Sequence, residues 1–365
     1  METMGITAAV LRSKDGPYLL EQVSLDEPRA HEVLVRIVAS GMCHTDLLPR
    51  SDFTFSPPPI ITGHEGAGVV VATGSAVTSI APGDHVVLSF DSCGECERCV
   101  AGEPAYCDTM TARNMSGRRF DQSSGVTDAT QTEVASRWFG QSSFATYAIA
   151  TERNAVRVDP DLPLTKLGPL GCGMQTGAAT VLLTLHVQRG ESVVVFGVGA
   201  VGMASVMAAK VAGASNIIAV DVHDERLQLA RDLGATHTIN GISDDVGARI
   251  LELTSGGVRH AIDTTGVPQV MRTAIDCVKS GGACAFVAYP TEPFHFDPLQ
   301  MAGKKVLGVI QGGADPQTFI PRMIDLWRAG QFPFDRLIAE YPFDRINDAE
   351  ADTMSGRVIK PVLVM

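Results

Sequence analysis

The sequence predicts an α/β protein of two parts, one rich in β-strands and one built on a parallel sheet. In the first 150 residues or so, short runs of Val and Ile alternate with Gly, Pro and Asp, as at 32–41, 66–77 and 83–90. This pattern is typical of β-strands joined by turns. From about Val193 onward, apolar runs alternate with helical patterns. That alternation predicts a doubly wound parallel sheet with helices on both faces.

The elements of the second part can be placed in order. Strands are predicted at 192–197, 216–222, 260–266, 283–289 and 305–310, and a last apolar run lies at 359–365. Helices are predicted after the first of these strands and at 225–235, 268–282 and 315–331. Residues 111–137 are rich in Ser, Thr, Asp and Gln, so we expect a long surface loop there.

Composition limits the class of protein. A chain of 365 residues is too long for one ordinary core, so two domains are expected, and 45% hydrophobic residues can fill both. With 41 acidic and 29 basic residues the net charge is −12, which repels phosphate backbones and anionic membranes. We therefore expect no nucleic-acid or membrane partner. The N-terminus lacks the pattern of a secretory signal, which predicts a cytoplasmic protein with reduced cysteines.

A glycine-rich turn follows the first strand of the second part. Gly197, Gly199 and Gly202 spell G-x-G-x-x-G, which lets the backbone approach a pyrophosphate at a helix N-terminus. Asp221 ends the next strand, where a carboxylate binds ribose hydroxyls and repels a 2′-phosphate. These residues predict an NAD site; the alternative is a structural turn with a solvated Asp. Arg226 could instead accommodate a 2′-phosphate, or contact the ribose from one helical turn in.

Four clustered cysteines predict a structural metal site. Cys93, Cys96, Cys99 and Cys107 lie within fifteen residues, spaced C-x2-C-x2-C-x7-C, which suits a closed tetrahedral zinc. Two disulfides or an iron–sulfur cluster are the alternatives. A reducing compartment argues against disulfides, and the seven residues before Cys107 differ from the bacterial cluster spacing.

Three scattered residues suggest a second metal site. Cys43, His64 and Cys172 offer two thiolates and one imidazole, which leaves a fourth position open, as in catalytic zinc sites. A lone His or Cys is more often a core residue, so the argument depends on the surrounding motifs. Cys277 and Cys284 we assign to core packing.

Those motifs carry a family resemblance. They are GMCHTDL (41–47), GHEGAGVV (63–70), the cysteine lobe (93–107), GCGMQTGA (171–178) and GVGAVG (197–202). They occur in the order found in zinc-dependent medium-chain alcohol dehydrogenases, which the chain resembles over nearly its whole length. The stretches GPLGCG, FGQSSFATYA and FPFDRLIAEYPFDRIN look most like the microbial aryl-alcohol (benzyl alcohol) branch.

The resemblance implies a fold, a set of domains and a reaction. The fold is a GroES-like β-rich catalytic domain, residues 1–173 and 313–365, into which a Rossmann NAD-binding domain is inserted at 174–312. Cys43, His64 and Cys172 would hold a catalytic zinc, and the cysteine lobe a structural one, giving two zinc ions per chain. The implied reaction transfers hydride from a primary alcohol, aromatic or allylic, to NAD and gives the aldehyde reversibly.

The resemblance also implies roles for neighbours of the zinc ligands. Asp46 would orient His64, although an Asp capping a helical turn is the simpler alternative. Glu65 would approach the zinc, and Thr45 would begin a proton relay. Many relatives carry a relay histidine where this chain has Leu48. His44 occupies a position where relatives place a basic residue against the pyrophosphate, and it either joins the relay or is a surface histidine.

Substrate-lining residues are implied at Thr45, Leu48, Phe90, Phe144 and Ile310. All but Thr45 are apolar, which suits an aromatic or allylic alcohol. Scattered Leu and Phe residues are equally common in protein cores.

Three other functions compete with this one. A zinc-free quinone or enoyl reductase of the same fold would not need seven metal ligands. A zinc-finger protein or NAD-sensing regulator is disfavoured by the acidic balance. A thiol-adduct formaldehyde dehydrogenase would need an Arg at the pocket mouth for the substrate's carboxylates, and Arg113, Arg118 and Arg119 could supply it.

Self-association is also expected. The run at 305–310 is predicted to be the last strand of the Rossmann sheet, and an exposed apolar edge is a liability unless it is paired. Relatives pair there, which implies a homodimer or homotetramer.

Overall fold

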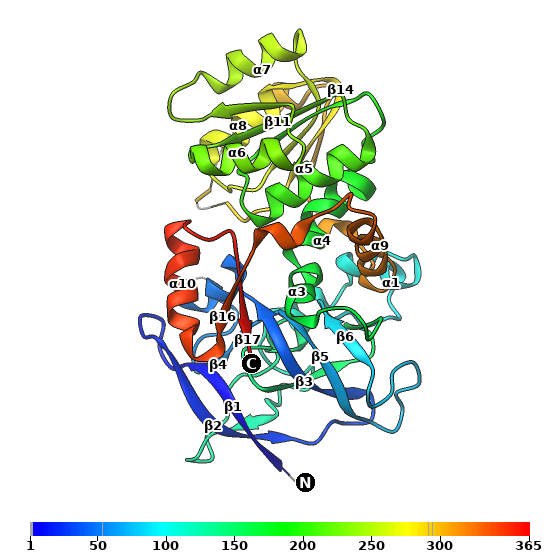
Figure 1. The fold of residues 1–365 in the computed structure, drawn as a ribbon, viewed down its shortest axis with the longest axis vertical. Helices are drawn as coiled ribbons and strands as arrows, with labels where there is room; N and C mark the ends of the chain where they lie inside the picture. Colours follow the sequence, from blue (N-terminus) through cyan, green and yellow to red (C-terminus); the bar gives the residue numbers. More distant parts are fainter. Residues whose placement is uncertain (1–2, 53, 291, 294) are drawn as a thin grey trace. The chain divides into compact units, whose positions relative to one another are not determined.

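The computed structural model describes residues 3–52, 54–290, 292–293 and 295–365, and it divides into two compact units (Figure 1). Unit 1 comprises Met1–Cys172, Asp315–Arg322 and Asp335–Met365. Unit 2 comprises Gly173–Ala314 and Met323–Phe334. The α/β fold class predicted from the sequence is confirmed, with a β-rich unit and a unit built on a parallel sheet.

Unit 1 contains two sheets. The larger one has the order β16-β17-β3-β5-β6-β9, with β8 also paired to β3, and the smaller one has the order β4-β1-β2-β7. The strands are β1 (Thr3–Leu11), β2 (Tyr18–Asp26), β3 (Glu32–Gly41), β4 (Ile60–Ile61), β5 (Glu65–Thr73), β6 (His85–Leu88), β7 (Val126–Thr127), β8 (Tyr147–Thr151), β9 (Ala155–Val158), β16 (Ile338–Pro342) and β17 (Lys360–Val364).

The helices of unit 1 are short except for α10. They are α1 (Glu97–Val100), α2 (Met110–Asn114), α3 (Leu164–Leu167) and α10 (Ile346–Ser355), with 3-10 helices η1 (His44–Arg50), η2 (Pro104–Tyr106), η3 (Trp138–Gly140), η4 (Gly168–Gly171) and η9 (Phe343–Arg345). The 3-10 helix η8 (Phe334–Leu337) and the helix α9 (Pro316–Arg328) each contribute residues to both units.

Strand β3 explains why unit 1 has two cores. Successive side chains of a strand point to opposite faces. Val33, Val35 and Ile37 accordingly belong to one buried apolar cluster, and Leu34 belongs to the other. The strand is thus buried on both sides, which fixes the segment that ends at the candidate site.

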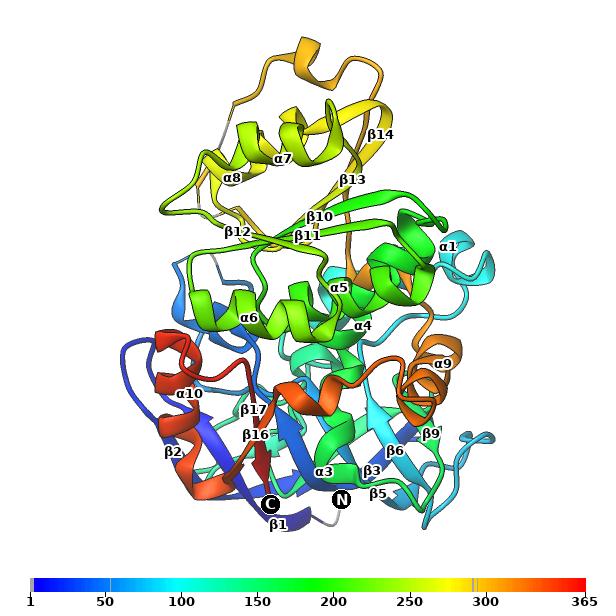
Figure 2. The same ribbon diagram turned by 45° about the horizontal axis from the view of Figure 1, so that its top comes forward.

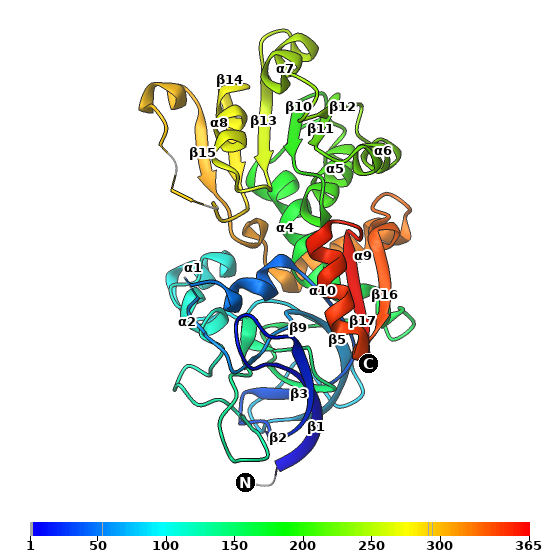
Figure 3. The same ribbon diagram turned by 90° about the vertical axis from the view of Figure 1, so that its left-hand side faces the viewer.

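Unit 2 is built on one parallel sheet with the order β12-β11-β10-β13-β14-β15. Its strands are β10 (Ser192–Phe196), β11 (Asn216–Asp221), β12 (His237–Asn240), β13 (Val258–Asp263), β14 (Val278–Phe286) and β15 (Lys305–Gly308). Figure 3 shows β15 at one edge of this sheet.

Helices cover both faces of that sheet. Figure 2 shows α5 (Ala200–Ala212) and α6 (Asp224–Leu233) on one face, and α7 (Val246–Thr254) and α8 (Pro268–Asp276) on the other. The unit also contains α4 (Gly173–Ala179), η5 (Thr180–Thr184), η6 (Pro298–Met301) and η7 (Gln311–Gly313). Cys277 and Cys284 are buried in the apolar cluster of this unit, as predicted.

The prediction of a long surface loop at 111–137 was right in part: most of the segment is irregular and residues 120–122 and 129–133 are exposed, but other residues are buried. The segment contains the end of α2 and strand β7, and it buries Asn114, Arg119 and Arg137. Arg119 forms ion pairs with Glu32 and Asp26. A polar composition indicated exposure, but these polar groups satisfy one another inside the fold.

Two further elements differ from the sequence reading. Strand β12 was not predicted, because four residues with one buried side chain give little apolar signal. Strand β14 begins at Val278, earlier than the apolar run at 283–289, and its pairing with β13 shifts register between Val258 and His260. A bulge of this kind interrupts the periodicity on which strand prediction relies.

Candidate functional site

Cys43, His64, Glu65 and Cys172 converge in unit 1. One potential ligand atom from each of the four lies within 4.8 Å of the others, and His64 Nε2 is 3.1 Å from Cys172 Sγ. Cys43 precedes η1, His64 precedes β5, Glu65 begins β5 and Cys172 follows η4. Two thiolates, an imidazole and a carboxylate are donors that zinc accepts, so these residues fit a zinc ion.

Asp46 connects two of these segments from a fully buried position in η1. Its Oδ1 lies 2.7 Å from His64 Nδ1 and also accepts the Gly63 backbone N–H at 2.9 Å. Its Oδ2 accepts the backbone N–H of Cys43 at 3.1 Å, so the carboxylate also caps η1. Because Asp46 engages Nδ1, the lone pair of Nε2 faces the cluster, which is the tautomer a metal ligand needs.

Phe139 is a neighbour that the sequence reasoning missed. Its ring packs on the His64 imidazole with centroids 4.6 Å apart and planes tilted by 31°, and Trp138 packs edge-on against it. The backbone of Phe139 has φ 50°, in the left-handed region, where a bulky residue is strained. Phe139 begins the stretch FGQSSFATYA, and the resemblance of this stretch to the aryl-alcohol branch was the only sign in the sequence that Phe139 matters.

Lys360 is the second residue that was missed. It lies on β17, is 1% exposed, and its Nζ donates to both carboxylate oxygens of Glu65 at 2.9 Å and to the Met42 carbonyl at 3.1 Å. A buried lysine requires an anionic partner, and Glu65 provides it. The signal available in the sequence was one cation inside the terminal apolar run at 359–365.

The charges of the cluster shift several pKa values. A hydrogen bond from Cys172 lowers the pKa of Cys43 well below its usual value, although burial opposes the shift. Burial raises the pKa of Glu65 to about 7, against the attraction of the Lys360 ammonium. Burial would lower the pKa of Lys360, but the charges of Glu65 and Cys43 outweigh burial and raise it. The cluster therefore favours the thiolate of Cys43 and the ammonium of Lys360, whereas burial works against the charge of Glu65.

The predicted relay residues follow Cys43 directly. Thr45 is half-buried, with its Oγ1 3.7 Å from Cys43 Sγ, and His44 is exposed. Leu48 packs against the core cluster that contains Phe90 and Phe144. Phe144 is fully buried and packs edge-on against Tyr18.

The four clustered cysteines converge separately. Cys93 Sγ is 3.9 Å from Cys99 Sγ, and Cys96 Sγ is 4.0 Å from Cys107 Sγ. All four are free cysteines, so the alternative of two disulfides is not supported. A zinc–sulfur bond of about 2.3 Å implies sulfur separations of about 3.8 Å in a tetrahedron. The lobe therefore has the dimensions of a closed zinc site.

In unit 2, the glycine turn joins β10 to α5. Gly197 has φ 79°, and a Cβ on Gly202 would lie 1.9 Å from the Gly197 carbonyl oxygen. A Cβ on Gly199 would meet nothing within 4 Å, so the backbone at the start of α5 is open to a ligand. An open helix N-terminus fits a pyrophosphate.

Asp221 lies at the end of β11, and its carboxylate accepts hydrogen bonds from the backbone. Its Oδ2 accepts the N–H of Val198 at 2.8 Å, and its Oδ1 accepts those of Val222 and His223. The carboxylate thus ties the end of β11 to the glycine turn. Arg226 is half-buried in the first turn of α6.

The arginines of residues 111–137 are engaged elsewhere. Arg113 pairs with Asp91, Arg118 with Glu133, and Arg119 with Glu32 and Asp26. They do not support a thiol-adduct formaldehyde dehydrogenase, because the carboxylates of its substrate need an Arg that is not already in an ion pair.

A β-rich unit with a candidate zinc site and a Rossmann unit with an open glycine turn define a metal-dependent dehydrogenase. Comparison with known proteins agrees. Residues 29–160 match the alcohol dehydrogenase GroES-like domain, and residues 200–328 match the zinc-binding dehydrogenase family. Geraniol dehydrogenase of Castellaniella defragrans is 45% identical over 98% of this chain and 97% of its own.

Two solved structures are similar over essentially the whole chain. An alcohol dehydrogenase zinc-binding domain protein from Burkholderia ambifaria is 46% identical with a TM-score of 0.97, covering 100% of both chains. Benzyl alcohol dehydrogenase from Acinetobacter calcoaceticus is 43% identical with a TM-score of 0.95, covering 99% of both.

The chain belongs to the zinc-dependent medium-chain alcohol dehydrogenases. It is an oxidoreductase of the family that uses zinc and NAD, and its resemblance to that family is confirmed. Within the described ranges, no helix is long and apolar enough to span a membrane.

Proposed function

We propose that the enzyme oxidises primary alcohols with an aromatic or allylic group to aldehydes, reversibly, with NAD as the acceptor. The observation that carries the proposal is the convergence of Cys43, His64 and Cys172 beside Glu65. Similarity to a geraniol dehydrogenase and to a benzyl alcohol dehydrogenase supports this class of substrate, since geraniol is allylic and benzyl alcohol aromatic.

In this proposal Cys43, His64 and Cys172 hold the catalytic zinc, and the cysteine lobe holds a second, structural zinc. When bound, the zinc polarises the alcohol oxygen and NAD accepts the hydride. Asp46 fixes the orientation of His64, and Glu65 stands beside the ligands, held by Lys360. These residues prepare the site before substrate arrives.

Proton removal begins at Thr45 in this proposal. Its Oγ1 lies 3.7 Å from Cys43 Sγ, so it would receive the proton of an alcohol held beside Cys43. His44 is exposed and completes the relay or contacts the cofactor pyrophosphate. Leu48 cannot carry a proton, so this chain lacks the histidine route of many relatives.

NAD is held by the turn of Gly197, Gly199 and Gly202, with Asp221 at the adenosine ribose and Arg226 nearby. Leu48, Phe90, Phe144 and Ile310 form the apolar wall for the substrate. Their apolar character supports this assignment.

At the scale of the chain, we propose a catalytic domain of residues 1–173 and 313–365 with an NAD domain at 174–312. We also propose a cytoplasmic homo-oligomer, either a dimer or a tetramer. The open edge of β15 supports self-association.

A substrate screen tests the proposal. Benzyl alcohol, cinnamyl alcohol, geraniol and short aliphatic alcohols are compared with NAD by the absorbance of reduced cofactor. We expect kcat/KM for the aromatic and allylic alcohols to exceed that of ethanol by at least about a hundredfold, because of the apolar area they bury. Thr45→Ser should keep most activity and Thr45→Ala should lose nearly all. Preference for short aliphatic alcohols would refute the substrate class.

A further inference from the structure

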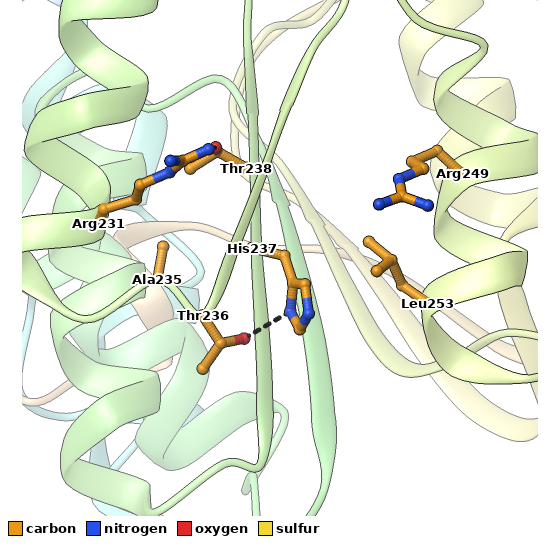
Figure 4. A pocket seen from close by; sticks show the side chains of 7 residues that line it. All are labelled: Arg231, Ala235, Thr236, His237, Thr238, Arg249 and Leu253. Atoms are coloured by element: carbon orange, nitrogen blue, oxygen red, sulfur yellow. Dashed lines mark hydrogen bonds between the residues drawn. The ribbon is translucent and has the colours of Figure 1, made fainter.

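Unit 2 contains a concavity that is distinct from the glycine turn. It is lined by Arg231, Ala235, Thr236, His237, Thr238, Arg249 and Leu253, with a volume of about 370 Å³ (Figure 4). Figure 4 shows Arg231 on one side, Arg249 and Leu253 on the other, and the threonines and His237 between them. Cavities of this size are large enough for small molecules.

The concavity lies away from the nucleotide site. Its strand residues are at the start of β12, the edge strand, and Ile218 pairs with His237. The glycine turn follows the carboxyl end of β10, two strands further in. In parallel sheets the dinucleotide occupies the carboxyl ends of the strands. The concavity lies at the amino ends of the strands, so the dehydrogenase reaction gives it no role.

The charge of the lining is opposite to that of the whole protein. The chain carries net charge −12, yet the seven lining residues include two arginines and a histidine and no carboxylate. Guanidinium groups remain protonated at any ordinary pH. The lining therefore favours anions over cations.

One of the arginines is already oriented. Arg231 Nε and Nη2 both donate to Thr238 Oγ1, the first at 2.8 Å. No carboxylate within the described part of the chain pairs with Arg231. A guanidinium held by a neutral hydroxyl keeps its full charge and loses little freedom on binding a ligand.

The second arginine is held by a carboxylate. Arg249 forms an ion pair with Glu252 one helical turn along α7, and both side chains are about half or more exposed. Exposed pairs of this kind contribute little stability. A more highly charged anion can therefore draw Arg249 away from Glu252.

We propose that this concavity binds a phosphate-bearing small molecule. Arg231 and Arg249 supply guanidinium donors from the two sides of the concavity, and His237 and the threonine hydroxyls supply further hydrogen-bonding groups for phosphate oxygens. A phosphate carries more charge and more acceptor oxygens than a carboxylate, which suits a lining with two guanidiniums. Ala235 and Leu253 offer apolar contact to the organic part of a phosphomonoester.

Calorimetric titration of the zinc enzyme, saturated with NAD so that the nucleotide site is filled, tests the proposal. Inorganic phosphate and glycerol 3-phosphate are the probes, with potassium chloride at matched ionic strength as the blank. Binding of both identifies the phosphate group as the recognised part. Tighter binding of glycerol 3-phosphate assigns the site to a phosphomonoester, and binding of inorganic phosphate alone assigns it to the free ion.

Variants give opposite expected effects. Arg231→Gln with Arg249→Gln should weaken binding by at least about tenfold, since two charge-assisted pairs are lost. Glu252→Gln should strengthen it, because Arg249 is released from its competitor. Arg189→Gln, an exposed site outside the concavity, should leave affinity unchanged.

Thermal unfolding provides the second measurement. Phosphate should raise the midpoint of the unaltered enzyme, and the double variant should lose this increase while folding normally without phosphate. If the double variant does not fold, Arg231→Lys, which keeps charge but loses the planar fork, should still weaken binding. Heats equal to the chloride blank, or equal affinity in the double variant, would overturn the proposal.

Discussion

At the scale of single residues, the site depends on buried charges placed beside the zinc ligands. Lys360 and Glu65 are both buried, and Lys360 Nζ lies 2.9 Å from a carboxylate oxygen of Glu65. Burying a single charge costs far more than burying a matched pair. The pair therefore acts as a unit, and removing one member is more damaging than removing both.

This predicts the result of a double-mutant cycle. Lys360→Met should lower the free energy of unfolding by about 3–5 kcal/mol, because buried Glu65 loses its ammonium partner and must either keep an unpaired charge or take up a proton. Adding Glu65→Gln should restore much of that loss. Urea unfolding of the zinc-loaded enzyme, together with its zinc content, measures both effects. Additive losses in the double variant would mean that the two residues act independently.

Asp221 has two roles that substitution can separate. Asp221→Asn removes the negative charge but keeps an acceptor for the Val198 N–H, whereas Asp221→Ser shortens the side chain. Both should raise use of NADP relative to NAD, since repulsion of a 2′-phosphate is lost. Both should also lower stability, Ser by about 1–3 kcal/mol and Asn by less, because the Asn amide keeps one acceptor oxygen while its NH2 faces backbone N–H groups that the carboxylate had satisfied.

The ratio of kcat/KM for the two cofactors and the unfolding midpoint provide the measurements. An unaltered enzyme that already prefers NADP would show that Arg226, and not Asp221, governs the choice of cofactor.

At the scale of elements, the segment 111–137 is held to unit 1 by a buried ion cluster. Arg119 Nε and Nη2 donate to the two oxygens of Glu32 at 2.8 and 3.0 Å, and Asp26 pairs with the same guanidinium. Burial would raise the pKa of Glu32, but the hydrogen bonds from Arg119 outweigh it, and the pKa lies below its ordinary value. A carboxylate whose pKa is lower in the folded state stabilises the protein above its unfolded-state pKa.

The stabilisation from Glu32 is therefore complete near neutral pH. It is lost as the pH falls through the pKa of Glu32 in the folded state, which lies below the ordinary value for Glu. Glu32→Gln should reduce the free energy of unfolding at pH 7, and the difference from the unaltered enzyme should shrink as the pH approaches 3. Urea unfolding at several pH values measures this. The exposed Glu27→Gln is the matched control, and it should show no such convergence.

The cysteine lobe has few apolar contacts of its own: α1 has no buried residue, and η2 adds Pro104 and Ala105, of which Ala105 joins the core cluster. Its stability depends on metal, because structural zinc binding is coupled to folding. Cys96→Ser should lose one zinc ion and lower the unfolding midpoint, while Cys43→Ser should abolish turnover and leave the chain folded. Retention of both zinc ions by Cys96→Ser would contradict a site built on four thiolates.

At the scale of the whole molecule, two measurements test the assembly. Metal analysis of fresh enzyme should give about two zinc ions per chain, since the ligands partition into two groups. Light scattering should give a dimer or tetramer. Leu307→Arg on β15, the edge strand, should favour the monomer because it places a charge on the pairing edge. A monomeric unaltered enzyme at micromolar concentration would refute self-association.

The sequence by itself determined the fold class, the parallel sheet of unit 2, the four clustered cysteines and the glycine turn. These features depend on spacing along the chain: alternation of apolar residues, C-x2-C repeats and G-x-G-x-x-G are local patterns. The tertiary structure decided what depends on residues distant in the chain. Lys360 meets Glu65 across 295 positions, and Phe139 stacks on His64 through a strained turn.

The same distinction explains the errors. The polar stretch at 111–137 was predicted to be exposed because local composition cannot show that Arg119 finds Glu32 87 positions away. The concavity beside β12 was missed because its two arginines lie on different helices and line one hollow only when α6 and α7 flank the strand. Folding brings distant charges together, and their energies depend on that distance and burial rather than on sequence spacing.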